Sequence, residues 1–508
     1  MATESSTAET PDAYETLLSK VKRLNNVSAA SMLLSWDQQV MMPEAGTPAR
    51  SQQLSALSAV HHDLLTDDEM GALLDDLESR ELSSEQAAVV REVRRDYERA
   101  VRVPTELVER ISQKTSEALP VWEQAKADDD WDAFAPHVEE LVELKRQYAE
   151  HIDPDADPYA VLFADYEPCL SLDRAEEILT EIRETLVPMI EEIRASETPI
   201  TTDAFAGTFD TDTQEAVARE ALTTLGYPWE RGRLDTSSHP FSTGTQFDAR
   251  VTTRFDESDP IGSITSSIHE FGHATYTLGL PDEAYATPLG EHRGLSVHES
   301  QSRLWENHVG RSQAFWERFL PTMTEHFPGL DGVTPREAYE SVNQVYEDNL
   351  IRVEADELTY HLHIVLRFEI ERALIAGDLS VDEVPAVWND KMEEYLGIRP
   401  ETDAEGCLQD IHWSHGSFGY FPTYSLGSAM AAQLFDAAAA DLDDVDARIR
   451  AGEFDPLREW LREHVHRHGQ RYETNDLVRE ATGEDFSAAA FTDYVTAKYG
   501  ALYDLDSV

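Results

Sequence analysis

Residues 269–273, HEFGH, place two histidines and a glutamate within a very short stretch. Side chains four residues apart lie on the same face of a helix, so His269 and His273 could bind one metal ion together. Glu270 would then be placed to act on a water molecule at that metal. Chance alone produces the pattern in about 6% of chains with this composition, so the flanking sequence must support it.

The flanking sequence predicts that HEFGH lies within a helix. Gly279 and Pro281 predict the end of that helix. Apolar residues recur at helical spacing beside the histidines, which form a neighbouring stripe. This mainly apolar stripe consists of Ile264, Ile268, Phe271, Thr275 and Leu278.

A hydrolytic zinc site needs a third protein ligand as well as an open coordination position. A metzincin would carry glycine at position 276 and histidine at position 279. This chain has Tyr276 and Gly279, which excludes that class. The alternative ligand is a carboxylate from a following helix, and Glu299, 26 residues after His273, is the candidate.

Glu299 has a second interpretation. Together with Ser296 it fits a capping box, in which Glu299 would fold back onto the N-terminus of its own helix. The spacing alone leaves both the ligand and the cap open. Arg303 also stands where thermolysin-type sites often carry an aspartate that orients a histidine, so such a carboxylate would have to come from elsewhere.

Helical periodicity dominates the chain and is clearest at 87–101, 174–195 and 343–377. The last segment ends at Gly377, a residue typical of helix C-termini. Strand-like alternation is convincing only at 245–255, just before HEFGH. We therefore predict a mainly α-helical fold with a small β-sheet next to the zinc helix. We also predict a disordered N-terminus over 1–12 and a single domain over 13–508.

The charge of the chain is strongly negative. Its 99 acidic and 41 basic residues give a net charge of −58, which is expected to repel nucleic acids and anionic membranes. The acidic residues are dispersed and only seven residues are lysine, which favours adaptation to a saline cytoplasm, as in a halophilic archaeon. Two cysteines, Cys169 and Cys407, and no evident secretion signal or membrane-length apolar run lead us to expect a cytoplasmic protein.

Several phrases together resemble the M32 metallocarboxypeptidases, the carboxypeptidase Taq family. Beside HEFGH, the matching phrases are HESQ (298–301), DARVT (248–252), IRVEAD (351–356), GCLQDIHW (406–413), HPF (239–241) and an N-terminal SWDQQVMMPEAGTPAR. The resemblance runs from about residue 15 to the C-terminus. It implies a helical fold with a long substrate groove, a homodimer, and the removal of single residues from the C-termini of peptide substrates.

The resemblance also implies that Glu299 is the third metal ligand rather than a cap. Zinc (Zn²⁺) is the expected metal for two histidines and a glutamate, and cobalt (Co²⁺) could occupy the same ligands. We expect Glu270 to act as the general base of a metal-assisted hydrolysis that has no covalent intermediate.

A carboxypeptidase must bind a terminal carboxylate, for which a guanidinium group is well suited. The resemblance favours Arg352, although Arg352 and Asp356 could instead form an i,i+4 pair on a helix. Arg250 is the second candidate and could equally belong to a solvated strand face. Asp248 and His239, which lie in the DARVT and HPF phrases, complete the predicted substrate-binding residues.

The segment 412–427, rich in glycine and aromatic residues, predicts a loop that places hydrogen-bond donors over the metal. His412 precedes Tyr424 by 12 residues, a spacing that related helical zinc peptidases use to stabilise the oxyanion. Tyr420 is the other tyrosine candidate. An aromatic loop packed on the core is the alternative interpretation.

Two other functions remain open from the sequence. A helical zinc oligopeptidase that cuts internal bonds would have the same metal site but would release internal fragments. An acidic scaffold protein, in which HEFGH is an ordinary helix face, would bind no metal.

Overall fold

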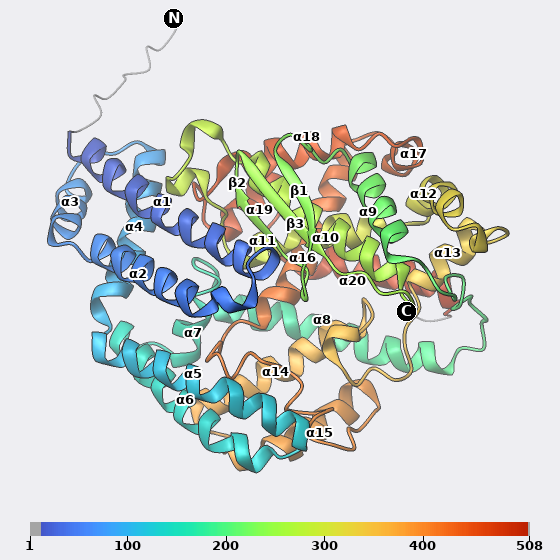
Figure 1. Ribbon diagram of the computed structural model, residues 1–508, viewed down its shortest axis with the longest axis horizontal. Helices are drawn as coiled ribbons and strands as arrows, with labels where there is room; N and C mark the ends of the chain where they lie inside the picture. Colours follow the sequence, from blue (N-terminus) through green and yellow to red (C-terminus); the bar gives the residue numbers. More distant parts are fainter. Residues whose placement is uncertain (1–11, 506–508) are drawn as a thin grey trace, which may run out of the picture.

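The fold is built from helices that surround one small sheet (Figure 1). The computed structural model describes residues 12–505. The helices before the sheet are α1 (Asp12–Val40), α2 (Thr47–Leu65), α3 (Asp68–Glu78), α4 (Ser84–Arg102), α5 (Thr105–Asp128), α6 (Trp131–Ile152), α7 (Pro158–Phe163), α8 (Leu172–Ala195) and α9 (Thr211–Leu225). The helices after it are α10 (Pro260–Gly279), α11 (Leu295–Arg303), α12 (Gln313–His326), α13 (Pro335–Val342), α14 (Thr359–Ala376), α15 (Val384–Leu396), α16 (Pro422–Asp441), α17 (Val445–Ala451), α18 (Asp455–His464), α19 (Thr474–Thr482) and α20 (Ala489–Tyr503). The mainly helical fold is confirmed.

The sheet has three strands, β1 (Gly232–Thr236), β2 (Ser242–Thr245) and β3 (Asp248–Thr253), with β3 in the centre. Strand β3 runs parallel to β1 and antiparallel to β2. Thr245 pairs with Asp248, so only a two-residue turn separates β2 from β3. The predicted single strand over 245–255 is wrong because the alternation runs through this turn. The sheet does pack against α10, as predicted.

The predicted helix over 343–377 begins later than expected. Only α14 is a continuous α-helix, and the segment before it contains a 3₁₀ turn, Arg352–Glu354. The helix begins where the Asp356 side chain accepts hydrogen bonds from the backbone N–H groups of Leu358 and Thr359. Such a side chain satisfies N–H groups that have no partner within the helix. The end at Gly377, with a φ of 86°, is as predicted.

The core has one large part and smaller satellites. The main apolar cluster contains residues from α5 through α20. Helices α1, α3 and α4 share a separate small cluster that includes Leu17, Leu74 and Val89. Helix α1 also packs against α2 and β2, so this N-terminal group of helices lies beside the sheet (Figure 1).

The predicted disordered segment, 1–12, lies outside the described residues except for Asp12, which is the first residue of α1. No helix within 12–505 has both the length and the apolar character that a membrane span requires.

Candidate metal centre

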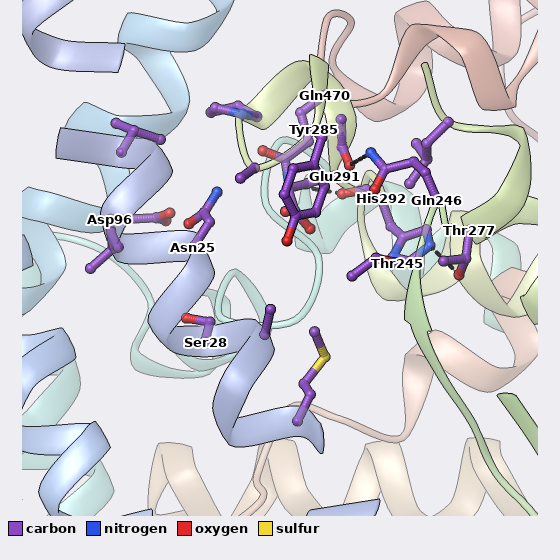
Figure 2. Close-up of a pocket in the computed structure, with 18 of the residues that line it drawn as sticks. Asn25, Ser28, Asp96, Thr245, Gln246, Thr277, Tyr285, Glu291, His292 and Gln470 are labelled. Atoms are coloured by element: carbon purple, nitrogen blue, oxygen red, sulfur yellow. Dashed lines mark hydrogen bonds between the residues drawn. The ribbon is translucent and has the colours of Figure 1, made fainter. Parts of the chain in front are cut away.

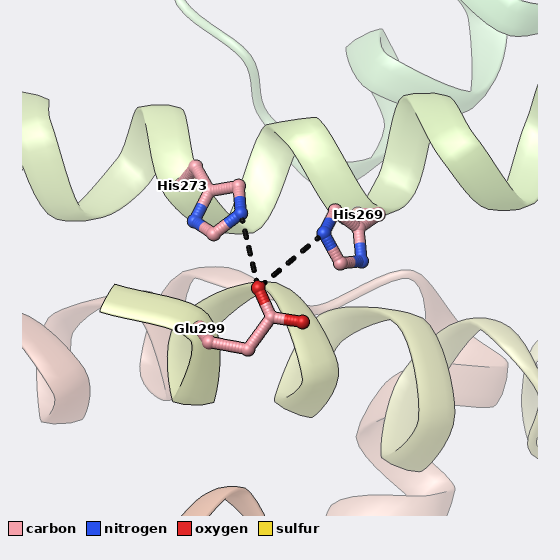
Figure 3. A group of neighbouring side chains, drawn as sticks. All are labelled: His269, His273 and Glu299. Carbon is pink, nitrogen blue, oxygen red and sulfur yellow. Dashed lines mark ion pairs between the residues drawn. The ribbon is translucent and has the colours of Figure 1, made fainter. Parts of the chain in front are cut away.

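Three side chains converge where α10 passes α11 (Figure 3). His269 and His273 project from successive turns of α10, and Glu299 projects from α11 toward both. The Nε2 atoms of His269 and His273 lie 3.7 and 3.5 Å from Oε2 of Glu299. The potential ligand atoms all lie within 4.8 Å of one another. The structure therefore brings together the three predicted metal ligands.

The other ring nitrogen of each histidine is held by a hydrogen-bond acceptor. His269 Nδ1 lies 2.8 Å from a carboxylate oxygen of Glu306, and His273 Nδ1 lies 3.1 Å from the backbone oxygen of His298. Because both partners accept, each Nδ1 carries the proton and donates it. The Nε2 lone pairs therefore point toward Glu299 and can bind a cation, as in most metal-binding histidines.

The N-terminus of α11 is capped by a residue from elsewhere in the chain. The buried carboxyl group of Glu167 accepts hydrogen bonds from the backbone N–H of Ser296 and, at 2.7 Å, from its hydroxyl group. Because Glu167 satisfies this helix end, Glu299 is not needed as a cap and extends toward α10 instead. The capping-box interpretation of Glu299 is wrong.

Arg303 and Glu306 complete a hydrogen-bonded network around the ligands. Arg303 Nε donates to Glu299 Oε1 at 2.7 Å, and Arg303 Nη1 donates to Glu306 Oε2 at 3.3 Å. Arg311 donates to the other Glu306 oxygen at 3.1 Å. Glu306 lies on a π-helical turn, Leu304–Gly310, which continues α11; such turns often occur at functional sites. Glu306 is thus the orienting carboxylate that position 303 does not supply.

The network also keeps the carboxylates ionised. Burial opposes the ionisation of Glu299, but the neighbouring Arg303 and the histidines outweigh it and hold the pKa of Glu299 well below its usual value. Burial likewise opposes the ionisation of Glu306, and Arg303, His269 and Arg311 together lower the pKa of that carboxyl. Both groups are therefore anionic at neutral pH.

Two glycines let other helices approach the ligands closely. A Cβ atom on Gly272 would lie 2.4 Å from the backbone oxygen of Gln301 and 2.5 Å from Cα of Ser302. A Cβ atom on Gly427 of α16 would lie 2.5 Å from Cγ of Glu299. Since these contacts are too short for any side chain, the glycine within HEFGH is needed to bring α10 against α11.

Glu270, the predicted general base, follows His269 on α10 and is 5% exposed. Burial raises the pKa of its carboxyl group above the usual value. Its Oε2 atom is buried and has no hydrogen-bond partner among the described residues. A buried carboxylate oxygen is costly unless water or a ligand pairs with it, so this atom indicates where such a group belongs.

The donor set fits a divalent transition metal. Two imidazole nitrogens and one carboxylate oxygen face one point, and each ligand is fixed by a further hydrogen bond. This is the ligand set of hydrolytic zinc sites, which keep one position for water or substrate.

Arg352 lies in the 3₁₀ turn before α14 and is only 7% exposed. Its Nη2 and Nε donate to Oδ1 of Asp410 at 2.7 and 3.0 Å, and its Nη1 donates to the Tyr360 hydroxyl at 3.2 Å. Arg367 donates to the other Asp410 oxygen at 2.5 Å. The alternative i,i+4 pair with Asp356 is wrong, because residues 352–356 do not form a continuous α-helix and Arg352 pairs with Asp410 instead.

Tyr360 connects Arg352 to the metal ligands. The guanidinium carbons of Arg303 and Arg352 lie 4.9 and 5.8 Å from the centre of the Tyr360 ring. Arg303 also binds Glu299 directly. The metal ligands and the predicted carboxylate-binding arginine are therefore parts of one contiguous site.

The three predicted oxyanion donors gather beside Arg352. The centre of the His412 ring lies 5.5 Å from that of Tyr420 and 6.5 Å from that of Tyr424. The Arg352 guanidinium lies 5.5 Å from the Tyr424 ring. His412 Nδ1 is buried, lies 3.7 Å from Asp410, and has no hydrogen-bond partner among the described residues. Burial lowers the pKa of His412, which favours its neutral form.

The remaining substrate-binding candidates lie on the sheet. Arg250 pairs with Asp248 through two nitrogens, at 2.6 and 3.0 Å, and its guanidinium lies 4.2 Å from the Trp36 ring of α1. His239 lies in the exposed segment between β1 and β2. None of the contacts described for residues 12–505 joins these three candidates to the metal ligands.

Sequence reasoning missed Glu167, Glu306, Tyr360 and Asp410 as parts of the site. Glu306 follows Glu299 by seven residues, and this two-turn spacing on one helix face was a usable signal. Asp410 lies within the GCLQDIHW phrase, but no role was assigned to it. Glu167 and Tyr360 come from other elements, and no local pattern indicates that they reach the site.

Comparisons with known proteins agree with this geometry. Residues 16–499 match the carboxypeptidase Taq (M32) metallopeptidase family model. Thermostable carboxypeptidase 1 of Thermus thermophilus is 39% identical over 509 residues, which cover 97% of this chain and all of the relative. Carboxypeptidase 1 of Bacillus subtilis is 36% identical over 487 residues, covering 95% of this chain and 97% of the relative.

Solved structures show the same similarity. The M32 carboxypeptidase from Deinococcus radiodurans has a TM-score of 0.94 at 36% identity, covering 97% of this chain and 100% of that chain. Metallocarboxypeptidase 1 of Trypanosoma cruzi has a TM-score of 0.91 at 35% identity, covering 96% and 99%. The fold and the site thus define a metallopeptidase. The chain belongs to the carboxypeptidase Taq (M32) family and is a metallocarboxypeptidase.

Proposed function

We propose that this metallocarboxypeptidase depends on zinc and releases single amino acids from the C-termini of peptides. The observation that carries the proposal is the convergence of His269, His273 and Glu299 beside a buried arginine cluster. The same ligands could hold Co²⁺. When bound, the metal polarises the scissile carbonyl group and makes water a stronger nucleophile at neutral pH.

Glu270 is the proposed general base. Its unpartnered Oε2 would accept a proton from the attacking water, and the carboxyl group would then pass that proton to the leaving amine. The raised pKa of the buried carboxyl supports this second role, because a stronger base holds the proton until the amine takes it.

Arg352 is the proposed partner of the substrate's terminal carboxylate. Two buried guanidinium groups, Arg352 and Arg367, share the single carboxylate of Asp410, so this trio carries an excess positive charge. Arg367 Nη2 is buried without a partner among the described residues. A buried excess charge is costly unless an anion pairs with it, and a peptide's terminal carboxylate supplies that anion.

His412, with Tyr420 or Tyr424, is proposed to donate hydrogen bonds to the oxyanion that forms from the scissile carbonyl. The position of these side chains beside Arg352 supports this role, since the terminal carboxylate lies one residue away from the scissile bond. Arg250, Asp248 and His239 are proposed to line the outer part of a long substrate groove, where Arg250 also joins α1 to the sheet.

Metal analysis followed by a peptide digest tests the proposal. Protein purified without added metal should carry about one equivalent of zinc, and chelation should abolish hydrolysis until Zn²⁺ or Co²⁺ is restored. The absence of a tight metal site would contradict the proposal and would favour the scaffold alternative.

The digest separates an exopeptidase from an oligopeptidase. A neutral peptide with a free C-terminus should lose residues one at a time, while the same peptide with a C-terminal amide should remain nearly intact. Internal fragments, or equal cleavage of the amide, would instead assign the chain to the internal-cutting alternative.

We also propose that the protein is a cytoplasmic homodimer adapted to high salt, with one catalytic domain over 13–508. The charge of −58 supports adaptation to high salt, and the two free cysteines support a cytoplasmic location. The continuous apolar cluster from α5 to α20 supports a single domain, and the family resemblance supports the homodimer. Light scattering and thermal unfolding at rising KCl test the homodimer and the salt adaptation. Unfolding should shift to higher temperature as screening reduces repulsion between carboxylates, with a mass of two chains throughout.

A further inference from the structure

A cavity of about 350 Å³ lies between α1 and the segment that follows α10 (Figure 2). Asn25 and Ser28 of α1 lie on one side of it, and Thr245 and Glu291 lie on the other. Pockets that hold small ligands or single side chains of a larger ligand measure about 300–1,000 Å³. The cavity is therefore large enough to receive one side chain of a peptide.

Glu291 is the chemically distinctive group in this cavity. Its side chain is largely covered but receives no hydrogen bond and no ion pair from any described residue, in contrast to the paired carboxylates of the metal centre. Burial alone raises the pKa of Glu291 to about 7. A carboxylate in this condition is stabilised by any cation that enters the cavity, because the cation replaces the water that burial removed.

The rest of the lining offers no competing cation. Among the described residues that line the cavity, none is lysine or arginine, and the second carboxylate of the lining, Asp96, is already paired with Arg95 at 2.8 Å. Burial lowers the pKa of His292 to about 3, so this imidazole is neutral at physiological pH. Glu291 is therefore the carboxylate among the described lining residues that has no cationic partner, and a cation entering the cavity would favour its ionised form.

A row of imidazoles joins the cavity to the metal centre. Thr277 lines the cavity one helical turn after His273, and its hydroxyl lies 3.0 Å from His292 Nε2. The His292 ring lies 4.5 Å from that of His298, which in turn stacks on His273 at 4.1 Å. Side-chain contacts thus link the cavity to the metal ligand His273, whereas Arg352 is linked to a different metal ligand, Glu299, by way of Arg303.

One edge of the three-stranded sheet borders the cavity. Gly244 and Thr245 of β2 line it, and β2 is an edge strand of the three-stranded sheet. An edge strand can pair with an extended peptide backbone. A peptide with its terminal carboxylate at Arg352 would therefore run its upstream residues toward the cavity.

We propose that this cavity is a subsite that binds a basic side chain of the peptide upstream of the scissile bond, with Glu291 as the group that selects it. The proposal rests on the carboxypeptidase function proposed above and adds a sequence preference to it. Lysine and arginine are the substrate residues whose charge and length suit a recessed carboxylate.

The experiment uses the purified enzyme with its metal and a set of N-acetylated neutral peptides with free C-termini. Lysine, glutamine or glutamate is placed in turn at each upstream position, and kcat/KM for release of the terminal residue is measured. The net charge of −58 favours lysine at every position, so the informative quantity is a preference confined to one position. Repeating the scan at 1 M KCl, where the Debye length is about 3 Å, suppresses the general field.

At one upstream position, lysine should exceed glutamine about tenfold, as expected for a charge-assisted contact, and the preference should persist at 1 M KCl. Glu291→Gln should reduce that ratio to about twofold or less. Glu283→Gln removes the same charge from the exposed turn nearby and should leave the ratio unchanged.

An even lysine preference at all positions, or a ratio that survives Glu291→Gln, would overturn the proposed subsite. The scan of the unaltered enzyme decides the matter even if the variant does not fold. Failure of the proposed function would look different, because the neutral peptides themselves would then lose no terminal residues.

Discussion

The metal half of the site and the arginine half differ in how completely their polar groups are paired. Around the metal ligands, Glu306, Arg303 and the backbone of His298 occupy the outer atoms of all three ligands. Around Arg352, two arginines share one aspartate, and His412 Nδ1 and Arg367 Nη2 have no partner among the described residues. One half is already fixed for its metal, while the other retains positive charge and donors for the substrate.

This contrast has a physical reason. A metal ion requires ligands held at fixed distances, which overlapping hydrogen bonds provide. A substrate must enter, react and leave, so its partners are best left with unmet charge or hydrogen-bonding capacity that the reacting groups then satisfy. Changes in the metal half should therefore affect metal binding, and changes in the arginine half should affect turnover of particular substrates.

The largest expected effect concerns Glu270. This residue lies in the metal half, but its Oε2 atom has no partner among the described residues, like the unpaired atoms of the arginine half. Glu270→Gln keeps the size of the side chain and removes the base, so kcat should fall by about 10²–10⁴-fold while the metal content stays the same. Stopped assays with a free-acid peptide and elemental analysis measure the two quantities. Substantial residual hydrolysis would remove Glu270 from the role of general base.

Glu306→Gln should affect metal affinity rather than chemistry. The amide has only one accepting oxygen, so it cannot accept hydrogen bonds from His269, Arg303 and Arg311 together. The dissociation constant for zinc should therefore rise about 10–100-fold. Competition with a chelator measures it, and activity should recover when excess zinc is added. Glu317→Gln is the control: it removes a carboxylate of α12 that is paired with Arg450 of α17, and it should leave zinc affinity unchanged.

Gly272→Ala should disturb the contact between α10 and α11. The added methyl group meets the backbone of Gln301 and Ser302, and such overpacking lowers the free energy of unfolding by about 1–3 kcal/mol. Gly500→Ala is the matched control, because this glycine of α20 has open space around it. That variant should gain about 0.5–1 kcal/mol from helix propensity. Equal urea-unfolding effects in both variants would contradict the close contact at Gly272.

The smallest expected effect is a pH dependence caused by Glu167. Burial raises its pKa to about 8 in the folded protein, from 4.5 in the unfolded chain. Between about pH 4.5 and 8 the folded state therefore holds a proton that the unfolded state releases, so this group makes the protein less stable as pH rises. Glu167→Gln keeps both contacts to Ser296 without ionising. The unfolding temperature of the variant minus that of wild type should therefore be larger at pH 8.5 than at pH 5.5. An identical difference at both pH values would show that Glu167 is not perturbed.

The two halves also differed in how well sequence predicted them. His269, His273 and Glu270 lie within one helix, where spacing fixes direction, so their grouping could be predicted locally. Glu299 was ambiguous because its alternative as a cap depended on Glu167, a residue far away in the chain. The resemblance to a known family, not the spacing, favoured the ligand role that the geometry now supports.

The arginine half depends on tertiary contacts that no local pattern contains. The helical pair of Arg352 with Asp356 was the alternative to a substrate-binding role, and it arose because periodicity continues through a segment that is not a continuous helix. The observed partner of Arg352, Asp410, is 58 residues away. The fold was predicted at the level of class and of helices α4, α8 and α10, whereas the strand boundaries failed at a two-residue turn that preserves alternation.

The central claim is that Arg352 makes this metal site specific for a free C-terminus. The direct test is the ratio of kcat/KM for a peptide acid to that for its C-terminal amide, measured in wild type and in Arg352→Gln with metal content monitored. The variant leaves Asp410 paired with Arg367. Wild type should prefer the acid by about 10²-fold, and the variant should lose most of that preference while keeping its metal. An unchanged ratio in the variant would contradict the account and would place carboxylate recognition elsewhere, with Arg250 the next residue to test.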